Sequence, residues 1–333
     1  MTSALVCVSG GVDSTAALLR SAKLFQRTRA VFVDVRESGV PSEAAEACSE
    51  LGVELTVIPG QESFRELVKG PSQTMMKQGL TPNPCALCNA GVKLAMPFSL
   101  LDKNELLVTG HYAGMRNGFL CRGADRSKDQ SYFLSLVPYG ILARCFFPLS
   151  DSLKEDVRNQ VKESGLPFIE KESQDLCFTH DAVFEPGEIV DLSGRVTGRH
   201  EGLAGYTPGQ RKGIGAHAGK KYVVRLDRVL NQVVIGDEND LYSKKCRLNS
   251  INWLQRPDQE SFRCLFQTRY RKTPFAAQVV LDRNRSEGEV LFDQPQKAVA
   301  PGQVGALYEG DSVTGGGIIS IEERWKQIDR QDC

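Results

Sequence analysis

The sequence of 333 residues contains no long apolar run, no internal repeat and no low-complexity linker. Its apolar runs, such as 30–33 and 233–235, end after a few residues, whereas a membrane-spanning helix needs ~20. The first residues carry no basic segment ahead of an apolar one, so a secretory signal is not expected. Apolar residues make up 41% of the chain and charged residues 25%, which excludes a disordered or fibrous protein. We therefore expect a folded, cytoplasmic protein with no membrane partner.

The chain also lacks net charge, because 41 Lys and Arg balance 41 Asp and Glu. The balance is uneven, since residues 195–272 carry sixteen basic and seven acidic side chains, an excess of nine positive charges. Such an excess favours a polyanion docking on that part of the chain. A solvated basic surface would give the same count.

The ten cysteines do not form a small disulfide scaffold, because a chain of this length can bury a core without such staples. Close-spaced cysteines in a reducing compartment indicate metal binding or redox chemistry instead. Cys7, Cys48 and Cys145 lie in apolar periodic segments, and we expect them to pack as small hydrophobic side chains.

The first half of the sequence alternates strand-like and helix-like segments. Strands are expected at 4–9, 29–35, 53–58 and 105–109, and helices at 13–24, 42–51, 62–79 and from Asn89 onward. Residues 116–119 predict a hairpin turn, and residues 152–155 predict a capping box that opens a helix ended by Gly165. The alternation indicates a doubly wound parallel sheet.

Beyond about Cys177, short β-branched runs separated by turn residues replace the helical pattern, at 222–226, 232–235, 277–281, 289–292 and 318–321. The expected fold is α/β: a Rossmann-like parallel sheet, a small β-rich central domain and a C-terminal β-barrel. We place these domains at 1–170, with a catalytic loop reaching about 185, at 186–242 and at 243–326.

The sharpest motif is the run Ser9-Gly10-Gly11-Val12-Asp13-Ser14, directly after a strand and at the start of a helix. Glycines let the backbone approach a phosphate, and the first helical N–H groups present positive potential to it. The serine hydroxyls add donors, and Asp13 is placed to hold Mg²⁺. No lysine follows the glycines, which excludes a Walker loop.

Several further motifs follow in order. Gly110-His111 ends a strand, where open α/β sheets bind ligands. The remaining motifs are Thr81–Asn89 with Cys85 and Cys88, Lys128–Leu134, Ser173–Phe178 with Cys177, Gly205–Gly215, Arg269–Arg271, Ala300–Gln303 and Gly315–Ile319.

The glycine loop resembles the pyrophosphate-binding loop of the adenine nucleotide α-hydrolase-like enzymes, which split ATP to AMP and pyrophosphate. The whole set of motifs, from Ser9 to about Ile319, is similar to the tRNA-specific 2-thiouridylases, which place sulfur on C2 of the wobble uridine. The resemblance implies a tRNA sulfurtransferase that uses ATP and Mg²⁺. The ATP-binding residues that it implies are Cys7, Val8, Ser9, Gly10, Gly11, Val12, Asp13, Ser14, Val33 and Gly110.

By the same resemblance, Cys177 carries a persulfide, and Cys88 is the nucleophile that forms a transient disulfide with Cys177. Such a role suits the chemistry, because a thiolate or persulfide attacks an activated carbonyl readily at neutral pH. Asn83, Pro84 and Cys85 are implied to face the target base. Many family members have Asp where this chain has Cys85, and the change creates an alternative: Cys85, Cys88 and Cys177 holding a 4Fe–4S cluster.

The implied tRNA-binding residues are His111, Lys128, Asp129, Gln130, Arg269, Tyr270 and Gln303. The implied partners are tRNAs for lysine, glutamate and glutamine, and a persulfide donor such as a cysteine desulfurase or a sulfur relay protein. Each of these residues also suits an ordinary polar surface, and a lone histidine after a strand is usually structural. Two other functions stay open: a ligase of the same loop class acting on a small molecule, and an RNA-binding module without catalysis.

Overall fold

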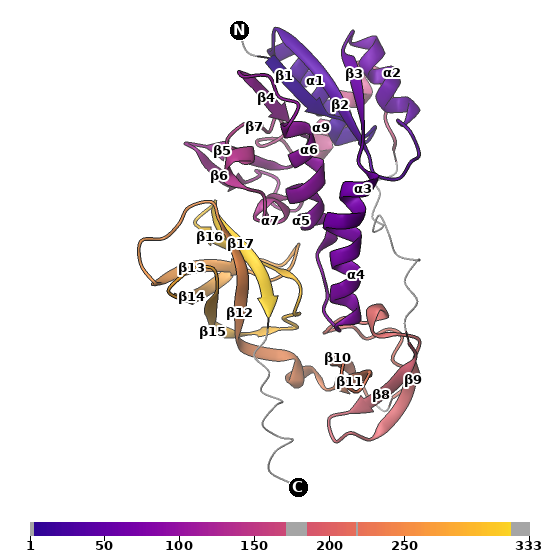
Figure 1. Ribbon diagram of the computed structural model, residues 1–333, viewed down its shortest axis with the longest axis vertical. Helices are drawn as coiled ribbons and strands as arrows, with labels where there is room; N and C mark the ends of the chain where they lie inside the picture. The colour runs from indigo at the N-terminus through magenta and orange to yellow at the C-terminus, as the bar shows by residue number, and fades with distance from the viewer. Residues whose placement is uncertain (1–2, 171–184, 218, 321–333) are drawn as a thin grey trace.

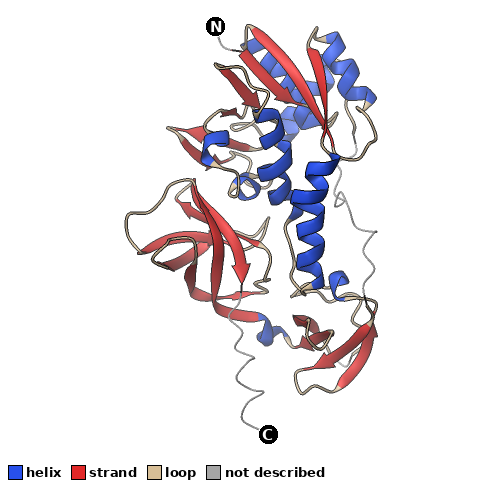
Figure 2. Ribbon diagram, in the orientation of Figure 1, coloured by secondary structure: helices blue, strands red, loops and turns tan. Residues whose placement is uncertain are grey.

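The computed structural model describes residues 3–170, 185–217 and 219–320, arranged around three sheets (Figures 1 and 2). The first sheet has five parallel strands in the order β3-β2-β1-β4-β7. Its strands are β1 Ser3–Cys7, β2 Arg27–Asp34, β3 Glu54–Pro59, β4 Glu105–Val108 and β7 Cys145–Phe146. The predicted parallel sheet is confirmed.

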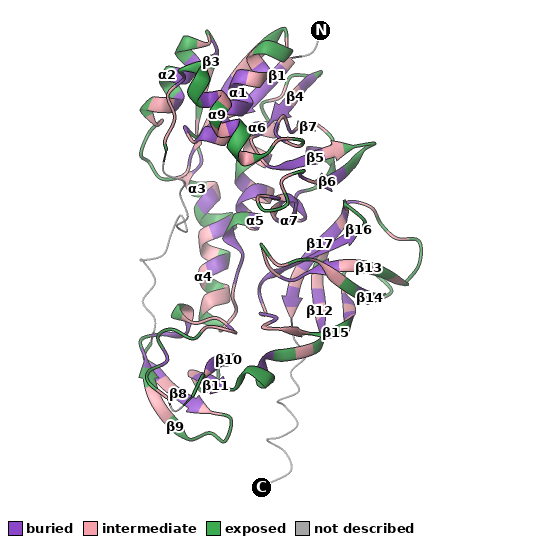
Figure 3. Ribbon diagram, turned by 180° about the vertical axis from the view of Figure 1, so that it is seen from behind, coloured by how far each residue is buried: buried purple, intermediate pink, exposed green. Residues whose placement is uncertain are grey.

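Helices cover both faces of this sheet, because neighbouring residues of each central strand point to opposite sides. Ala4 and Val6 of β1 pack with α1 and α2, whereas Leu5 packs with α5, α7 and α8 on the other face. Buried residues therefore line the central strands (Figure 3). The helices are α1 Val12–Leu24, α2 Ser42–Glu50, α7 Ser131–Leu134, α8 Tyr139–Leu142 and α9 Lys154–Ser164.

A helical arm leaves the edge of this sheet and runs toward the central domain (Figure 1). It consists of α3 Gln61–Phe64, the π-helical turn η1 Arg65–Lys69 and α4 Gly70–Lys77. A second helical segment packs against its first half and consists of α5 Pro84–Cys88, the π-helical turn η2 Asn89–Lys93 and α6 Ala95–Phe98.

Two expected local features are wrong. The helix expected from Asn89 begins at Pro84, because the Asn83 side chain accepts the N–H of Ala86 at 3.1 Å and caps the first turn. Cys85 and Cys88 therefore lie on a helix rather than in a loop. The capping box of residues 152–155 does not form, since α9 starts at Lys154 and the Ser152 hydroxyl accepts Arg20 instead.

Two other local predictions are confirmed. The strands β5 Ala113–Arg116 and β6 Phe119–Arg122 form a hairpin whose turn residues Asn117 and Gly118 both have positive φ. Gly165 ends α9 in the left-handed conformation, with φ of 74°.

The central domain is a four-stranded sheet in the order β10-β11-β8-β9, with a small apolar core of its own. Its elements are β8 Gly187–Asp191, β9 Val196–His200, η3 Leu203–Gly205, β10 Tyr222–Asp227, β11 Gln232–Gly236 and η4 Glu238–Leu241.

The C-terminal strands form an antiparallel barrel that is closed because β12 pairs with both β15 and β17. The strands are β12 Tyr242–Trp253, β13 Ser261–Gln267, β14 Phe275–Leu281, β15 Gly288–Lys297, β16 Val304–Glu309 and β17 Ser312–Ser320. The predicted barrel is confirmed, although sequence patterns did not indicate β12, β13 or β16. The β5–β6 hairpin of the N-terminal domain extends the barrel sheet, with Cys121 opposite Ser312.

The barrel and the parallel sheet also share one hydrophobic core. Leu5 of β1 and Leu107 of β4 belong to the same buried cluster as Val304, Ala306 and Tyr308 of β16. The barrel is thus packed against the helices that cover the second face of the sheet. Among the described helices, none has the length and apolar character that crossing a membrane requires.

Candidate functional site

The glycine loop between β1 and α1 is held by hydrogen bonds among its own residues. The Ser14 hydroxyl accepts the backbone N–H of Ser9 at 3.1 Å and lies 3.1 Å from the Ser9 hydroxyl. It also donates to the Gly11 carbonyl at 2.9 Å. The two serines of the motif therefore fix the loop from within.

The first turn of α1 is suited to bind a polyphosphate. Gly11 is the N-cap, and no side chain caps the turn, so its N–H groups keep their capacity to donate to an anion. A Cβ added at Gly11 would meet only the Ser9 hydroxyl, at 3.8 Å, whereas Gly10 adopts φ of +78°, which favours glycine. This geometry fits the predicted ATP phosphates.

Gly110 lets the loop after β4 touch the backbone of α1. A Cβ there would lie 2.6 Å from the carbonyl oxygen of Asp13 and 3.0 Å from the backbone nitrogen of Ser14. Any side chain at residue 110 would push the strand end and the helix start apart. The predicted nucleotide residue Gly110 is thus required for the shape of the loop.

The Asp13 carboxylate makes an ion pair that the sequence did not predict. Lys154, at the start of α9, donates to its two oxygens at 2.8 and 2.7 Å, and the Tyr112 hydroxyl donates to one of them at 2.9 Å. A magnesium ion at Asp13 would have to displace this ammonium, so the carboxylate as placed does not fit a metal ligand.

Val33 and Val8, also predicted near ATP, lie at the ends of neighbouring strands. The backbone N–H of Val8 donates to the Val31 carbonyl at 2.9 Å. Val33 packs beside Gly60, where an added Cβ would lie 2.6 Å from a Val33 methyl carbon. Val33 also contacts the apolar cluster around Cys88, so the nucleotide strand and the cysteine helix are neighbours.

The two cysteines of α5 differ in exposure. Cys85 is exposed, whereas Cys88 is 5% exposed and packs with Phe64, Val68 and Val92. The π-helical turn η2 begins directly after Cys88, and single π-helical turns occur frequently at functional sites. Cys177 lies outside the described residues.

The cysteine helix and the glycine loop meet at Lys93, the last residue of η2. The Cys7 thiol, two residues before the loop, donates to the Lys93 carbonyl at 3.8 Å. Burial raises the pKa of Cys7 to about 12, partly offset by the Lys93 charge. The end of β1 and the continuation of the cysteine helix are therefore in contact.

His111 lies at the same edge of the sheet. Its Nδ1 is 2.7 Å from the Thr109 hydroxyl. Burial, and secondarily the charge of Lys93, lowers the pKa of His111 to about 3. The imidazole is therefore neutral near pH 7, and whether it contacts RNA stays a prediction.

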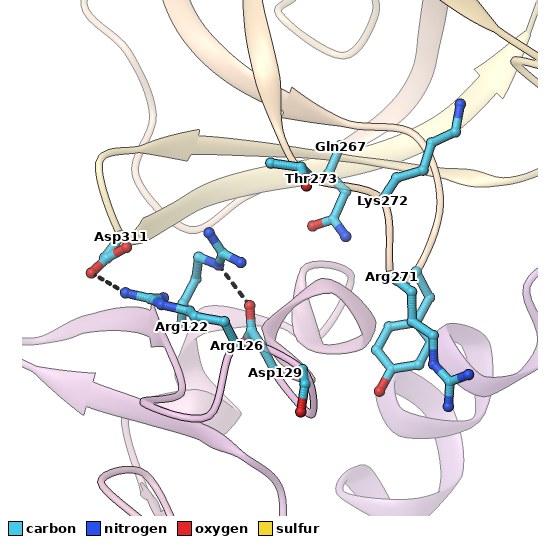
Figure 4. Close-up of a pocket in the computed structure, with 10 residues that line it drawn as sticks. Arg122, Arg126, Asp129, Gln267, Arg271, Lys272, Thr273 and Asp311 are labelled. Atoms are coloured by element: carbon cyan, nitrogen blue, oxygen red, sulfur yellow. Dashed lines mark hydrogen bonds and ion pairs between the residues drawn. The ribbon is translucent and has the colours of Figure 1, made fainter. Parts of the chain in front are cut away.

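A cavity of about 320 Å³ lies between the loop after β6 and the β13–β14 loop of the barrel (Figure 4). Arg122 pairs with Asp129 at 2.7 Å, and Arg126 pairs with Asp311 at 2.6 Å. The barrel side contributes Gln267, Tyr270, Arg271, Lys272 and Thr273. The two domains thus jointly form a polar cavity in which four basic residues outnumber two acidic ones.

On the barrel side of this cavity, aromatic and cationic groups lie together. The Arg271 guanidinium lies 5.5 Å from the Tyr270 ring centre, and that ring contacts Phe133 in a tilted arrangement, with 4.4 Å between the ring centres. Burial lowers the pKa of Lys272, as do the charges of Arg269 and Lys297. A ring and nearby cations suit nucleotide binding.

Other predicted tRNA residues make contacts within the protein. Asp129 is 8% exposed and, besides Arg122, accepts the N–H groups of Gly123 and Ser131. Gln130 accepts the N–H of Tyr112 at 3.0 Å. Gln303 is also 8% exposed, and its amide nitrogen donates toward the loop before α5.

The alternative iron–sulfur site is only partly within the described residues. Cys85 and Cys88 supply two thiols on one helix, one fewer than the predicted three-cysteine cluster needs. Within residues 3–170, 185–217 and 219–320, no group of three or more His, Cys, Asp or Glu side chains could hold a metal ion. The described thiols alone do not fit a cluster.

Comparison with protein families covers almost the whole chain. Residues 2–181 match the "tRNA methyl transferase HUP domain", residues 178–237 the "tRNA methyl transferase PRC-barrel domain" and residues 243–319 the "Aminomethyltransferase beta-barrel domain". Among solved structures, U34-tRNA thiolase NcsA from Methanococcus maripaludis, with its 4Fe–4S cluster, is 18% identical with a TM-score of 0.36. That alignment covers 54% of this chain and 62% of NcsA.

Curated relatives are much more similar. The tRNA-specific 2-thiouridylase MnmA of Acidithiobacillus ferrooxidans is 37% identical, over 96% of this chain and 99% of its own length. MnmA of a Synechococcus strain is 36% identical, over 97% of this chain and 99% of its own. The chain belongs to the tRNA-specific 2-thiouridylase family.

Proposed function

We propose that this protein is an ATP-dependent sulfurtransferase that converts the wobble uridine of tRNA to 2-thiouridine. Oxygen O2 of the uracil attacks the α-phosphorus of ATP, and pyrophosphate leaves. The terminal sulfur of a persulfide on Cys177 then attacks C2, and AMP leaves. The Cys88 thiolate attacks the Cys177 sulfur and releases the thiolated base, and an external thiol reduces the resulting disulfide.

In this proposal the glycine loop stabilises the leaving pyrophosphate. The first N–H groups of α1 would donate to it, while the Ser9 and Ser14 hydroxyls, which are hydrogen-bonded inside the loop, hold these groups in place. These donors are fixed before the reaction begins, which avoids reorganisation in the transition state. Asn83, Pro84 and Cys85 are proposed to face the uracil.

The observation that carries the proposal is the contact between Cys7 and Lys93. Cys7 ends the strand that leads into the phosphate loop, and Lys93 ends the π-helical turn that starts after Cys88. The contact keeps an activated base and a nucleophilic thiol within one region of the fold. The reaction needs this proximity.

We propose that tRNA docks across all three domains of the chain, and that these domains span residues 1–170, 186–242 and 243–326. The cavity between the loop after β6 and the β13–β14 loop would take a nucleotide or phosphate, and the basic stretch 195–272 would hold further phosphates. Affinity should then fall steeply with salt. The tRNAs for lysine, glutamate and glutamine, and a cysteine desulfurase or relay protein as sulfur donor, are proposed as partners.

The test compares Cys88→Ser and Cys177→Ser with wild type, using tRNA, ATP and a persulfide donor. Each variant should lose at least about a hundredfold in 2-thiouridine formed, measured by mass spectrometry of digested tRNA, because a hydroxyl is a poor substitute for a thiolate. The dissociation constant for tRNA should be unchanged. Cys264→Ser, a partly buried barrel thiol, is the matched control. Full turnover in either variant would contradict the assigned roles.

Two measurements separate the alternatives. A small-molecule ligase would exchange ATP with pyrophosphate equally well with and without tRNA, whereas the proposed enzyme needs tRNA, and a non-catalytic module shows no exchange. A colourless, iron-free preparation that still thiolates tRNA would exclude the iron–sulfur variant of the reaction.

A further inference from the structure

A turn of the barrel, residues 301–303, is hydrogen-bonded to the loop that precedes the cysteine helix, and we call this set of bonds the grip. The Gln303 amide nitrogen donates to the carbonyls of Thr81 and Pro82, at 3.0 and 3.1 Å. In return, the N–H of Thr81 donates to the Pro301 carbonyl at 2.8 Å. Three hydrogen bonds therefore join segments that are more than two hundred residues apart in sequence.

Gly302 allows this close approach. It adopts φ of +91°, which disfavours any side chain, and an added Cβ would lie 2.9 Å from both the Leu80 Cβ and the Thr81 nitrogen. The turn is itself fixed to the barrel, because the Gly302 N–H donates to the Ile319 carbonyl, and the Ile319 N–H donates to the Gln303 carbonyl, each at 2.8 Å. The grip is thus built on a rigid strand pair.

The gripped loop leads directly into α5. Pro82 is followed by Asn83, whose side chain accepts the N–H of Ala86 and so caps α5, two residues before Cys85 and five before Cys88. Ala86 of α5 and Val304, next to Gln303, are fully buried in the same core. Because this core holds the two domains together, we expect removal of the Gln303 donors to shift the loop while lowering the free energy of unfolding only slightly.

We infer that Gln303 is a positioning residue for Cys88, coupling the placement of the barrel to that of the cysteine helix. Both amide hydrogens of Gln303 are directed at the Thr81 and Pro82 carbonyls, and its side chain is largely buried, so its contribution is made inside the protein. RNA held by the barrel then fixes the reactive thiol through this grip. The inference rests on the proposed function and assigns one more residue to it.

The test uses the full chain with Gln303→Met, which keeps the side-chain length without donors, and Gln303→Glu, which sets a carboxylate against two carbonyls. We expect kcat for tRNA thiolation to fall about tenfold or more, because a small displacement of a reacting group is costly. The dissociation constant for tRNA should change by a smaller factor than kcat does, because the Gln303 amide is bonded to the loop before the cysteine helix. Gln278→Met, an exposed barrel glutamine bonded to Ser261, is the control.

Hydrogen exchange gives a second readout that does not depend on catalysis. The amides of Ala86 and Leu87, bonded to Asn83, should exchange faster in Gln303→Met than in Gln278→Met in the absence of tRNA. Weaker tRNA binding with unchanged kcat would overturn the inference, as would unchanged exchange. If wild type shows no thiolation but exchange accelerates, the grip stands and the proposed function fails.

Discussion

The glycine loop and the cysteine helix are supported in opposite ways. The loop of residues 9–14 is closed by hydrogen bonds that span five residues or fewer, centred on Ser14. The cysteine helix receives its support from Pro301 and Gln303 of the barrel and from the core around Val304. One half of the site is supported within the N-terminal domain, where Lys154 and Ile169 also bond to the loop, and the other half depends on the last strands of the chain.

Because the glycine loop and the cysteine helix are supported differently, they should respond differently when the barrel moves. A locally closed loop keeps its shape when domains shift, so nucleotide binding should be insensitive to changes in the barrel. The position of Cys88, by contrast, should follow the barrel. Substitutions in the loop, at its charge partner and at the sheet edge test this division.

Gly110→Ala should damage the local half most. The added Cβ meets backbone atoms of Asp13 at 2.6 Å, and a helix backbone cannot move aside as a side chain can. We expect a loss of about 3 kcal/mol in the free energy of unfolding, near the upper range for overpacking. Urea denaturation measures it, and ATP binding by calorimetry should be lost in parallel.

Gly140→Ala is the matched control for this change, because Gly140 lies in a helix of the same domain and its added Cβ meets nothing within 4 Å. If Gly110→Ala binds ATP with the affinity of wild type, the loop can accommodate a side chain at residue 110 despite the short contact with the Asp13 backbone. Gly110 would then not be required for the shape of the loop.

Lys154→Met tests whether nucleotide binding by the loop depends on the positive charge that pairs with Asp13. Without the ammonium, the Asp13 carboxylate would repel the phosphates, so the KM for ATP should rise about tenfold. The measurement is pyrophosphate exchange as a function of ATP concentration. Lys162→Met, at the other end of α9, is the control.

Asp13→Asn in the Lys154→Met background separates two roles for the carboxylate. If repulsion is the cause, the double variant should recover most of the affinity for ATP, measured by calorimetry. A further loss instead would mean that Asp13 binds a metal ion with the nucleotide, as the sequence motif predicted.

His111→Gln addresses the border where the two halves meet. The folded pKa of about 3 lies below the unfolded value of about 6.5, so the unfolded chain takes up a proton as pH falls through 6.5 and the folded protein does not. The contribution of His111 is complete above pH 6.5 and declines toward pH 3. Wild type should lose about 1 kcal/mol relative to His111→Gln between pH 7.5 and 5.5.

Urea denaturation of both proteins at the two pH values measures this difference. If wild type and His111→Gln differ in the free energy of unfolding by the same amount at pH 7.5 and 5.5, the imidazole is not held neutral at the sheet edge. Burial beside Lys93 would then not lower the pKa of His111.

The local half of the site was the predictable half. Ser9, Gly10 and Ser14 belong to one short motif whose chemistry is readable because the hydrogen bonds of its two serines lie within a few residues. The hairpin at Asn117 and Gly118 was predictable for the same reason, since a two-residue turn needs those residue types.

The distant half was not predictable from patterns. Lys154 lies 141 positions from Asp13, and neither residue carries a local signal of the pairing. The prolines around Asn83 suggested a loop, whereas Asn83 and Pro84 in fact begin a helix. Strand β12, with two adjacent lysines and a polar stretch, was missed because a strand in a small barrel needs only one apolar face.

The pairing of the β5–β6 hairpin with β17 has a consequence for how the chain is made. Cys121 and Ser312 are 191 positions apart, so at roughly 5–20 residues per second a ribosome needs on the order of 10–40 s between them. For that interval the outer edge of β6 is present without the strand that covers it. Nascent chains halted before β17 should therefore be more prone to mispairing than the finished protein.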